Sequence, residues 1–339
     1  MNQKEALARK IYEGAVVFDG LNVSNWDSPA VFRSLKEGNI TAINATIATW
    51  ENFQETLNHI SHWATLFSKY EADVLQVQTA DDINRAKQDG KVGVILGFQN
   101  ASPIENDLDR LALFRQLGVG IIQVTYHERN LLGNGCYERR DDGLSNFGVD
   151  AIREMNQVGI LIDLSHVGDR TTLETIDLSE KPVACTHANA RSYHDVPRNK
   201  ADEALKLMAE KGGVVGATCI RTFLRNGAKS TLKDYIDAID HMVQLVGIDH
   251  VGIGTDFTQD QPSTFWRYIG SQQGTKFPSS FQDGSVDYTD VELYPKGIET
   301  PDEMSNIAVA LMARGYSEED ILKVLGGNWL RLSQQVWPN

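Results

Sequence analysis

The stretch GILIDLSHVGDRTTLETIDLSEKPVACTH, Gly159–His187, contains two short, largely apolar runs. The first run, Gly159–Ser165, is followed by His166, and the second, Pro182–Thr186, is followed by His187. Runs of this length and composition are typical of strands buried on both faces of a parallel sheet. Adjacent parallel strands end at one edge of their sheet, so the two histidines are predicted to lie close together.

Six further runs of the same kind occur along the chain, and helical patterns separate most of the eight. These six are Val16–Val23, Ile40–Ile47, Val92–Gln99, Val119–Tyr126, Gly213–Cys219 and His250–Phe257. The clearest helical patterns are Glu105–Leu117, Asp150–Gln157 and Ala201–Lys211. Eight buried strands alternating with helices predict an α/β fold, a (β/α)₈ TIM barrel. A doubly wound open sheet is the alternative.

The barrel is expected to form one domain over residues 1–339, with one long insertion after the eighth strand. This insertion, residues 258–300, shows little periodicity and is rich in Gln, Ser, Gly and aromatic residues. A long irregular segment in a compact domain is often functional, and this one would lie on the active-site face. It is predicted to be a lid or a dimer contact, or an extension packed on the barrel.

Composition and charge exclude several classes of function. The chain has 339 residues, 41% of them hydrophobic, and a formal net charge of −14. A chain so acidic, without a polybasic run, is not expected to bind nucleic acid or an anionic membrane. Neither a secretory signal nor a membrane-spanning run is visible, and the three cysteines show no CxxC spacing. A cytoplasmic protein with reduced thiols is the expectation.

Residues that can bind a metal or move protons stand where the predicted strands end. They are Gln99, His127, Asp163, His166, His187 and Asp256. A single histidine at such a position is more often structural, but three of the eight histidines follow successive runs. His166 and His187 can supply two ligands of a zinc site, which needs about three protein ligands and a water. Asp163 is either a buried carboxylate or an outer-shell partner of the metal site.

The motifs DLSHVGDRTTLETIDLSEKPVACTHANAR, DVPRN and DHVGIGTDF, together with GLSNFGVDAIREMNQVGILIDLSH, make the chain recognisable. They resemble the membrane (renal-type) dipeptidase family, zinc peptidases of the amidohydrolase-like barrel group. The resemblance covers nearly the whole chain. It implies two zinc ions, cleavage of dipeptides, some with a D-residue at the second position, and a homodimer.

Five residues match functional positions of that family. The resemblance implies that His166 and His187 bind one zinc ion and that His127 contacts the scissile carbonyl. It also implies that Arg198, in DVPRN, binds the substrate carboxylate. Asp256, in GTDF, matches the acidic residue near the substrate amine and the proton-transfer machinery.

The ligands of the other zinc ion are replaced. The family's first strand ends in Asp-Gly-His-x-Asp, but here Asp19–Val23 reads DGLNV, so Leu21 and Val23 occupy the two ligand positions. Gln99 occupies the position of the bridging glutamate, and a neutral amide does not offset the repulsion of two cations. Three of the five expected ligands are therefore lost, and at most one zinc ion is predicted.

The expected function is that of a dipeptidase-family hydrolase that cleaves a dipeptide or a related small amide with one Zn²⁺. In this reading Asp256 is the base, Arg198 anchors an anionic group, and Gln99 is a weak or outer-shell ligand. A non-hydrolytic protein that binds a small metabolite on the same barrel is the alternative. A two-zinc enzyme that recruits Asn22 or Asn44 is disfavoured, because amides are weak zinc ligands.

Overall fold

The computed structural model describes residues 3–271, 273–274 and 292–338 of the 339-residue chain. Its strands are β1 (Phe18–Asn22), β2 (Ala42–Ala48), β3 (Val74–Gln76), β4 (Val92–Phe98), β5 (Val119–Gln123), β6 (Leu161–Asp163), β7 (Ala184–Cys185), β8 (Val214–Ala217) and β9 (Val251–Ile253). All eight predicted strands are present among them, and β3 is additional.

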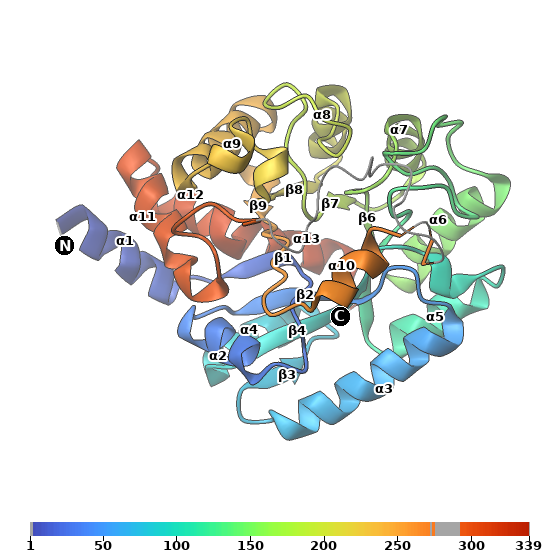
Figure 1. Cartoon of the computed structure of the whole chain (residues 1–339), viewed down its shortest axis with the longest axis horizontal. Helices are drawn as coiled ribbons and strands as arrows, with labels where there is room; N and C mark the ends of the chain where they lie inside the picture. Colours follow the sequence, from blue (N-terminus) through green and yellow to red (C-terminus); the bar gives the residue numbers. More distant parts are fainter. Residues whose placement is uncertain (1–2, 272, 275–291, 339) are drawn as a thin grey trace.

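The strands form one closed parallel barrel (Figure 1). Their order is β2-β1-β9-β8-β7-β6-β5-β4-β3, and a further pairing between β2 and β4 closes the ring. The predicted (β/α)₈ TIM barrel is therefore confirmed, and the open-sheet alternative is wrong. In such a barrel the residues that follow the strands gather on one face.

Strand β3 lies outside the ring of eight. It pairs with the first half of β4, where Val74 lies opposite Val92. The second half of β4 pairs with β5, where Phe98 lies opposite Ile122. Strand β4 thus has two neighbours on the same side, β3 and β5. Strand β3 extends the barrel only at the amino-terminal end of β4.

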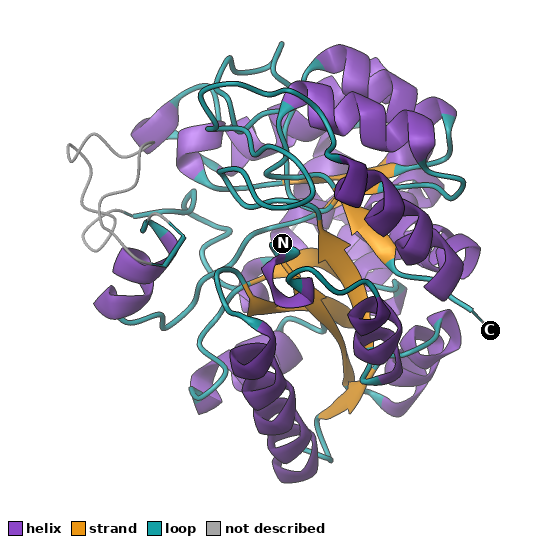
Figure 2. Cartoon of the chain, turned by 90° about the vertical axis from the view of Figure 1, so that its right-hand side faces the viewer, coloured by secondary structure: helices purple, strands orange, loops and turns teal. Residues whose placement is uncertain are grey.

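The helices lie outside the strands, as Figure 2 shows. They are α1 (Gln3–Gly14), α2 (Pro29–Glu37), α3 (Phe53–Lys69), α4 (Ala80–Asp89), α5 (Asp109–Gln116), α6 (Asn146–Val158), α7 (Asp169–Leu178), α8 (Asp202–Glu210), α9 (Leu232–Val246), α10 (Ser263–Ile269), α11 (Ser305–Arg314), α12 (Glu318–Leu322) and α13 (Asn328–Val336). Gly159 ends α6 in the left-handed conformation, with φ 77°, which glycine adopts without strain.

The barrel interior has a core of its own, closed at the bottom by α13. Trp329 is 1% exposed, and its indole N–H donates to the carbonyl of Ile253 at 2.9 Å. The indole lies against Gly20, Gly216 and Gly252, where a Cβ would come within 2.5–2.9 Å of it. Small residues in three strands therefore make room for one large ring that fills the bottom of the barrel.

The insertion after the eighth strand is not wholly irregular, because it contains α10. The hydroxyl groups of Thr258 and Tyr294 lie 2.6 Å apart and form a hydrogen bond between the beginning and the end of the insertion. Three aromatic residues that marked the insertion, Phe277, Phe281 and Tyr288, lie outside the described residues. Among the helices that the structure describes, none is long and apolar enough to span a bilayer.

Candidate active site

A cavity opens at the carboxyl ends of the barrel strands. Its polar lining includes Gln99, Tyr126, His127, Tyr137, His166 and Asp256. Its apolar lining includes Val23, Ile220, Phe223, Phe265, Trp266 and Leu293. A mainly apolar wall with a few converging polar groups is typical of a small-molecule binding site.

Three histidines from successive strands form a contact chain in the cavity wall. His166 Nε2 lies 2.8 Å from His187 Nε2, and His166 Nδ1 lies 3.2 Å from His127 Nδ1. The ring of Tyr126 stacks on His166 with 4.3 Å between the ring centres. The predicted meeting of the strand-end histidines is thus observed, with His187 fully buried beneath the other two.

The hydrogen bonds of Thr186 define which nitrogen of His187 carries the proton. The Thr186 hydroxyl donates to Asp163 Oδ2 at 2.6 Å, so it must accept at 2.8 Å from His187 Nδ1. This leaves a lone pair on His187 Nε2, directed at His166. An imidazole fixed through its other nitrogen in this way is the usual form of a metal-binding histidine.

Asp163 is a buried carboxylate that accepts several hydrogen bonds, and its role as an outer-shell partner of a metal stays a prediction. Besides Thr186, it accepts hydrogen bonds from the backbone N–H of Ser165 at 3.0 Å and from its hydroxyl at 2.6 Å. The backbone N–H of Thr186 donates to it as well, at 2.8 Å. Asp163 thus ties together the turns that present His166 and His187.

Burial lowers the pKa of all three imidazoles well below the usual value of 6.5. The positive charge of Arg198 lowers the pKa of each ring further. Burial disfavours the charged form, so His127, His166 and His187 are neutral near pH 7. Neutral imidazole is the form that can donate a lone pair to a metal ion.

Asp256 faces the same cavity from the end of β9. Its backbone has φ 62°, and its N–H donates to the carbonyl of Leu21 at 3.1 Å. Burial raises the pKa of its carboxyl group to about 7, opposed by the charge of Arg198 and reinforced by that of Asp19. Within the described part of the chain, no group donates a hydrogen bond to this carboxylate. A carboxylate with such a pKa can take up and release a proton near neutral pH.

Arg198 lies behind the cavity wall and is 1% exposed. Its Nη1 donates to the carbonyl of Ser165 at 2.6 Å, and its Nη2 donates to the carbonyl of His187 at 2.7 Å. The guanidinium carbon lies 5.2 Å from the centre of the Phe223 ring, which does line the cavity. Only Nε has no partner among the described residues, so anchoring of a substrate carboxylate by Arg198 stays a prediction.

The positions of the replaced ligands do not fit a second metal ion. Leu21 is buried and offers no donor atom, and Val23 presents an apolar side chain to the cavity. Gln99 donates its amide N–H to the hydroxyl of Thr46 at 3.1 Å. The side-chain amide of Asn22 donates to Asp19 at 3.4 Å, which speaks against its recruitment as a substitute ligand.

His166 and His187 are the two imidazoles that could hold one metal ion. In this structure their Nε2 atoms are 2.8 Å apart, so His166 Nε2 carries the proton that faces the lone pair of His187, and an ion bound by both residues would replace this proton. In the part of the chain that the structure describes, no group of three or more His, Cys, Asp or Glu side chains completes a metal site. Catalytic zinc usually has three protein ligands, so an ion held by this pair is expected to bind more weakly than in a complete site.

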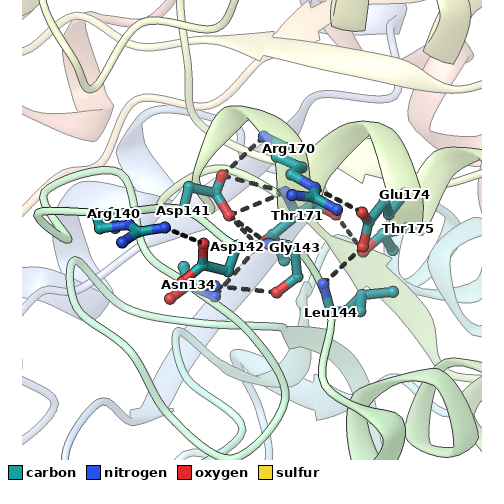
Figure 3. Close-up of polar contacts among 10 residues, drawn as sticks. All are labelled: Asn134, Arg140, Asp141, Asp142, Gly143, Leu144, Arg170, Thr171, Glu174 and Thr175. Atoms are coloured by element: carbon teal, nitrogen blue, oxygen red, sulfur yellow. Dashed lines mark hydrogen bonds and ion pairs between the residues drawn. The ribbon is translucent and has the colours of Figure 1, made fainter.

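A long loop between β5 and α6, residues 124–145, covers one side of the cavity and carries Tyr137. The loop is attached to the first turn of α7, as Figure 3 shows. The carboxylate of Asp141 accepts hydrogen bonds from the backbone N–H of Arg170 at 2.7 Å and of Thr171 at 3.1 Å. An anion at a helix N-terminus is favoured by the free N–H groups and by the helix dipole. Tyr126, Tyr137 and this attachment could not be predicted from the sequence, because only the folded chain brings these segments together.

The chain is similar to known proteins in sequence and in fold. A family model described as membrane dipeptidase, peptidase family M19, matches residues 13–266. The chain is 32% identical to an uncharacterized dipeptidase of Schizosaccharomyces pombe over 60% of its own length and 51% of the relative's. It is 25% identical to dipeptidase tcpJ of Claviceps purpurea over 84% of its length and 60% of the relative's. The chain thus spans little more than half the length of these curated relatives.

Two solved structures cover almost the whole chain. An amidohydrolase from Pseudomonas aeruginosa is 40% identical, with a TM-score of 0.92 over 97% of this chain and 99% of its own. A metallo peptidase from Rhodobacter sphaeroides, liganded with a phosphinate mimic of the dipeptide L-Ala-D-Ala, has a TM-score of 0.78. It is 22% identical over 95% of this chain and 99% of its own, which shows a shared fold.

Proposed function

This chain belongs to the membrane dipeptidase family, and on that premise we propose that it hydrolyses a dipeptide or a related small amide with at most one zinc ion. The observation that carries the proposal is the pair His166 and His187, whose Nε2 atoms converge to 2.8 Å beside a cavity that Asp256 also faces. This arrangement combines two neutral metal ligands with a carboxyl group able to carry protons.

Different side chains are assigned to metal binding, proton transfer and binding of the substrate carbonyl. An ion held by His166 and His187 would supply polarisation of the substrate carbonyl and would lower the pKa of a water. Asp256 takes a proton from the attacking water and returns it to the leaving amine, and its pKa of about 7 suits both steps. His127 lines the cavity beside His166, and we assign to it the hydrogen bond to the substrate carbonyl.

The substrate is expected to be small and partly apolar. The apolar lining formed by Phe223, Phe265 and Trp266 favours a side chain that loses contact with water on binding. Arg198 adds a buried positive charge behind Phe223 and favours an anionic group such as a terminal carboxylate. The homodimer and the cytoplasmic location expected from the sequence stay predictions.

A non-hydrolytic binding protein is the second candidate function. Leu21, Val23 and Gln99 stand at three of the family's five ligand positions, and none of them carries a charge that could hold a cation. Both ligands that belong to the other zinc ion alone, at positions 21 and 23, are lost together. This concerted loss favours a changed role for the cavity. In that case Asp256 and Arg198 bind a small metabolite without cleaving it.

The metal content of the purified protein, with and without added zinc, separates the two candidates. Elemental analysis is expected to give about one ion per chain for the wild type and none for His166→Ala. His250→Ala is the matched control, because His250 bonds the carbonyl of Gly213 at the opposite end of β9 and should leave the content unchanged. Cleavage of a panel of dipeptides is measured by mass spectrometry. If the wild type takes up no zinc and cleaves none of these dipeptides, the hydrolase proposal fails and the binding protein is favoured.

A further inference from the structure

Every carbonyl of the turn Leu164–Val167, which presents His166, accepts a hydrogen bond from another part of the chain. Lys200 Nζ donates to the carbonyl of Leu164 at 2.9 Å and to that of Val167 at 2.6 Å. Arg198 donates to the carbonyl of Ser165, and the backbone N–H of Cys136 donates to that of His166 at 2.8 Å. The backbone around His166 is thus held at four consecutive points.

Lys200 is an unusual residue to find at this place, because it is 1% exposed. Its third hydrogen bond goes to the hydroxyl of Thr172 at 2.9 Å, and within the described residues it forms no ion pair with a carboxylate. Burial of a lysine costs free energy, because its charge leaves water without a carboxylate partner. Stability alone therefore gives a poor reason for Lys200.

The backbone of Lys200 is itself attached to the chain that follows His187. Its N–H donates to the carbonyl of Asn189 at 2.9 Å, and its carbonyl accepts from the N–H of Arg191 at 2.8 Å. The side chain of Lys200 holds the turn of His166, and its backbone is fixed to the segment after His187. One residue thus connects the two turns that carry the imidazole pair.

We infer that Lys200 is a positioning residue that sets the His166 turn relative to His187 and so aligns the two imidazoles. The inference rests on the proposed function in one respect, because it assigns the purpose of this alignment to binding one metal ion. Lys200 acts through the carbonyls of Leu164 and Val167 and does not contact the cavity. Residues that orient metal ligands in this way typically change metal affinity by about 10- to 100-fold when they are mutated.

Three variants separate positioning from a merely structural role. Lys200→Met keeps the length of the side chain and removes the donors. Thr172→Val removes one of the three acceptors, is milder, and serves if the first variant does not fold. Lys211→Met is the matched control, because Lys211 Nζ also donates to two backbone carbonyls, those of Ile176 at 2.7 Å and Asp177 at 2.9 Å, at the far end of α7.

The first readout compares zinc affinity by calorimetry with the melting temperature. Lys200→Met is expected to bind zinc about 10- to 100-fold more weakly. Its melting temperature is expected to fall, because three buried acceptors lose their donor, so zinc affinity is measured at a temperature where the variant is folded. Thr172→Val is expected to weaken binding in the same direction by a smaller factor, and Lys211→Met to leave it unchanged. Zinc affinity within about twofold of the wild type in folded Lys200→Met, or in Thr172→Val if Lys200→Met does not fold, overturns the inference.

The second readout does not depend on zinc. Imidazole ¹⁵N resonances of His166 and His187 report the geometry of the pair, and they are expected to shift in Lys200→Met and to stay fixed in Lys211→Met. Unshifted resonances in Lys200→Met overturn the positioning role. If the wild type binds no zinc while these resonances shift as expected, the proposed one-ion hydrolase fails and the positioning role of Lys200 stands.

Discussion

The carboxyl group of Asp256 ionises within the neutral pH range, because burial raises its pKa from 3.8 to about 7. Its folded-state pKa lies above its unfolded-state value, so the folded state binds the proton more tightly. The resulting contribution to stability is complete below about pH 4 and is lost as the pH rises through about 7.

Replacement of Asp256 by Asn is therefore expected to flatten the dependence of stability on pH. At pH 8 the variant should be more stable than the wild type by up to about 4 kcal/mol, since one pKa unit corresponds to about 1.4 kcal/mol. Urea unfolding at pH 4, 6 and 8 measures this difference. Parallel pH profiles for the two proteins would contradict the assigned pKa, and the variant should also lose at least about 100-fold in hydrolytic rate.

Restoring the three replaced ligands is expected to rebuild the second metal site. The triple variant Leu21→His, Val23→Asp and Gln99→Glu restores the donors of the family's other site and should raise the zinc content from about one to about two ions per chain. Elemental analysis with excess zinc measures the change, and Leu21→His alone serves as the control. A content that stays at one ion would show that these positions do not face a common metal site.

Sequence reasoning found the residues of the site better than it found their contacts. His127, His166, His187 and Asp256 could be predicted because the end of a barrel strand places a side chain on the active-site face. The burial of Arg198 and the role of Lys200 could not be predicted. They depend on where loop side chains point, and this follows from packing between segments far apart in the sequence.

Among the elements, α7 and the loop before α6 depend on each other. The N-cap residue of α7, Gly168, has no side chain, so Asp141 of the loop takes over this role. Asp141→Ala should lower the free energy of unfolding by about 1–2 kcal/mol, because the first N–H groups of the helix lose their acceptor.

Hydrogen exchange followed by mass spectrometry tests the same variant locally. Faster exchange is expected in residues 130–145 and in the first turn of α7, with the barrel strands unchanged. Asp150→Ala is the control, because Asp150 is exposed and forms only an i,i+3 pair with Arg153 in α6. Equal exchange of the loop in the wild type and in Asp141→Ala would mean that other contacts hold it.

The strands and longer helices could be predicted from the sequence because each carries a repeated apolar pattern. The pattern Asp150–Gln157, for example, lies within α6 (Asn146–Val158). Strand β3 could not be predicted because its segment has only two consecutive apolar residues, Val74 and Leu75, and α10 could not because its seven residues are too few to show a helical period.

For the whole molecule, the resemblance seen in the sequence is confirmed, since the membrane dipeptidase model matches residues 13–266. The eight apolar runs favour the closed barrel but also fit an open sheet, and the pairing of β2 with β4 decides between the two. The filling of its lower end does not follow from the strand pattern. It depends on Trp329, which lies in the last helix and contacts three glycines in separate strands.

Truncation of this ring tests how the barrel core is held together. Trp329→Ala should cost about 3–5 kcal/mol, because it leaves a large cavity and removes the hydrogen bond to Ile253. Leu7→Ala is the control, since Leu7 is 47% exposed on α1 and its loss should change stability by less than about 0.5 kcal/mol. Chemical denaturation measures both, and a small effect of Trp329→Ala would mean that the core collapses around the gap.

The position of Trp329 also has a consequence for how the protein is made. A ribosome releases the eight barrel strands before it releases α13, so the nascent barrel emerges with its lower end open to water. The apolar side chains there stay exposed until the final helix docks. The last step of folding must therefore follow translation of α13, and a nascent chain stalled before that helix would be a natural client for chaperones.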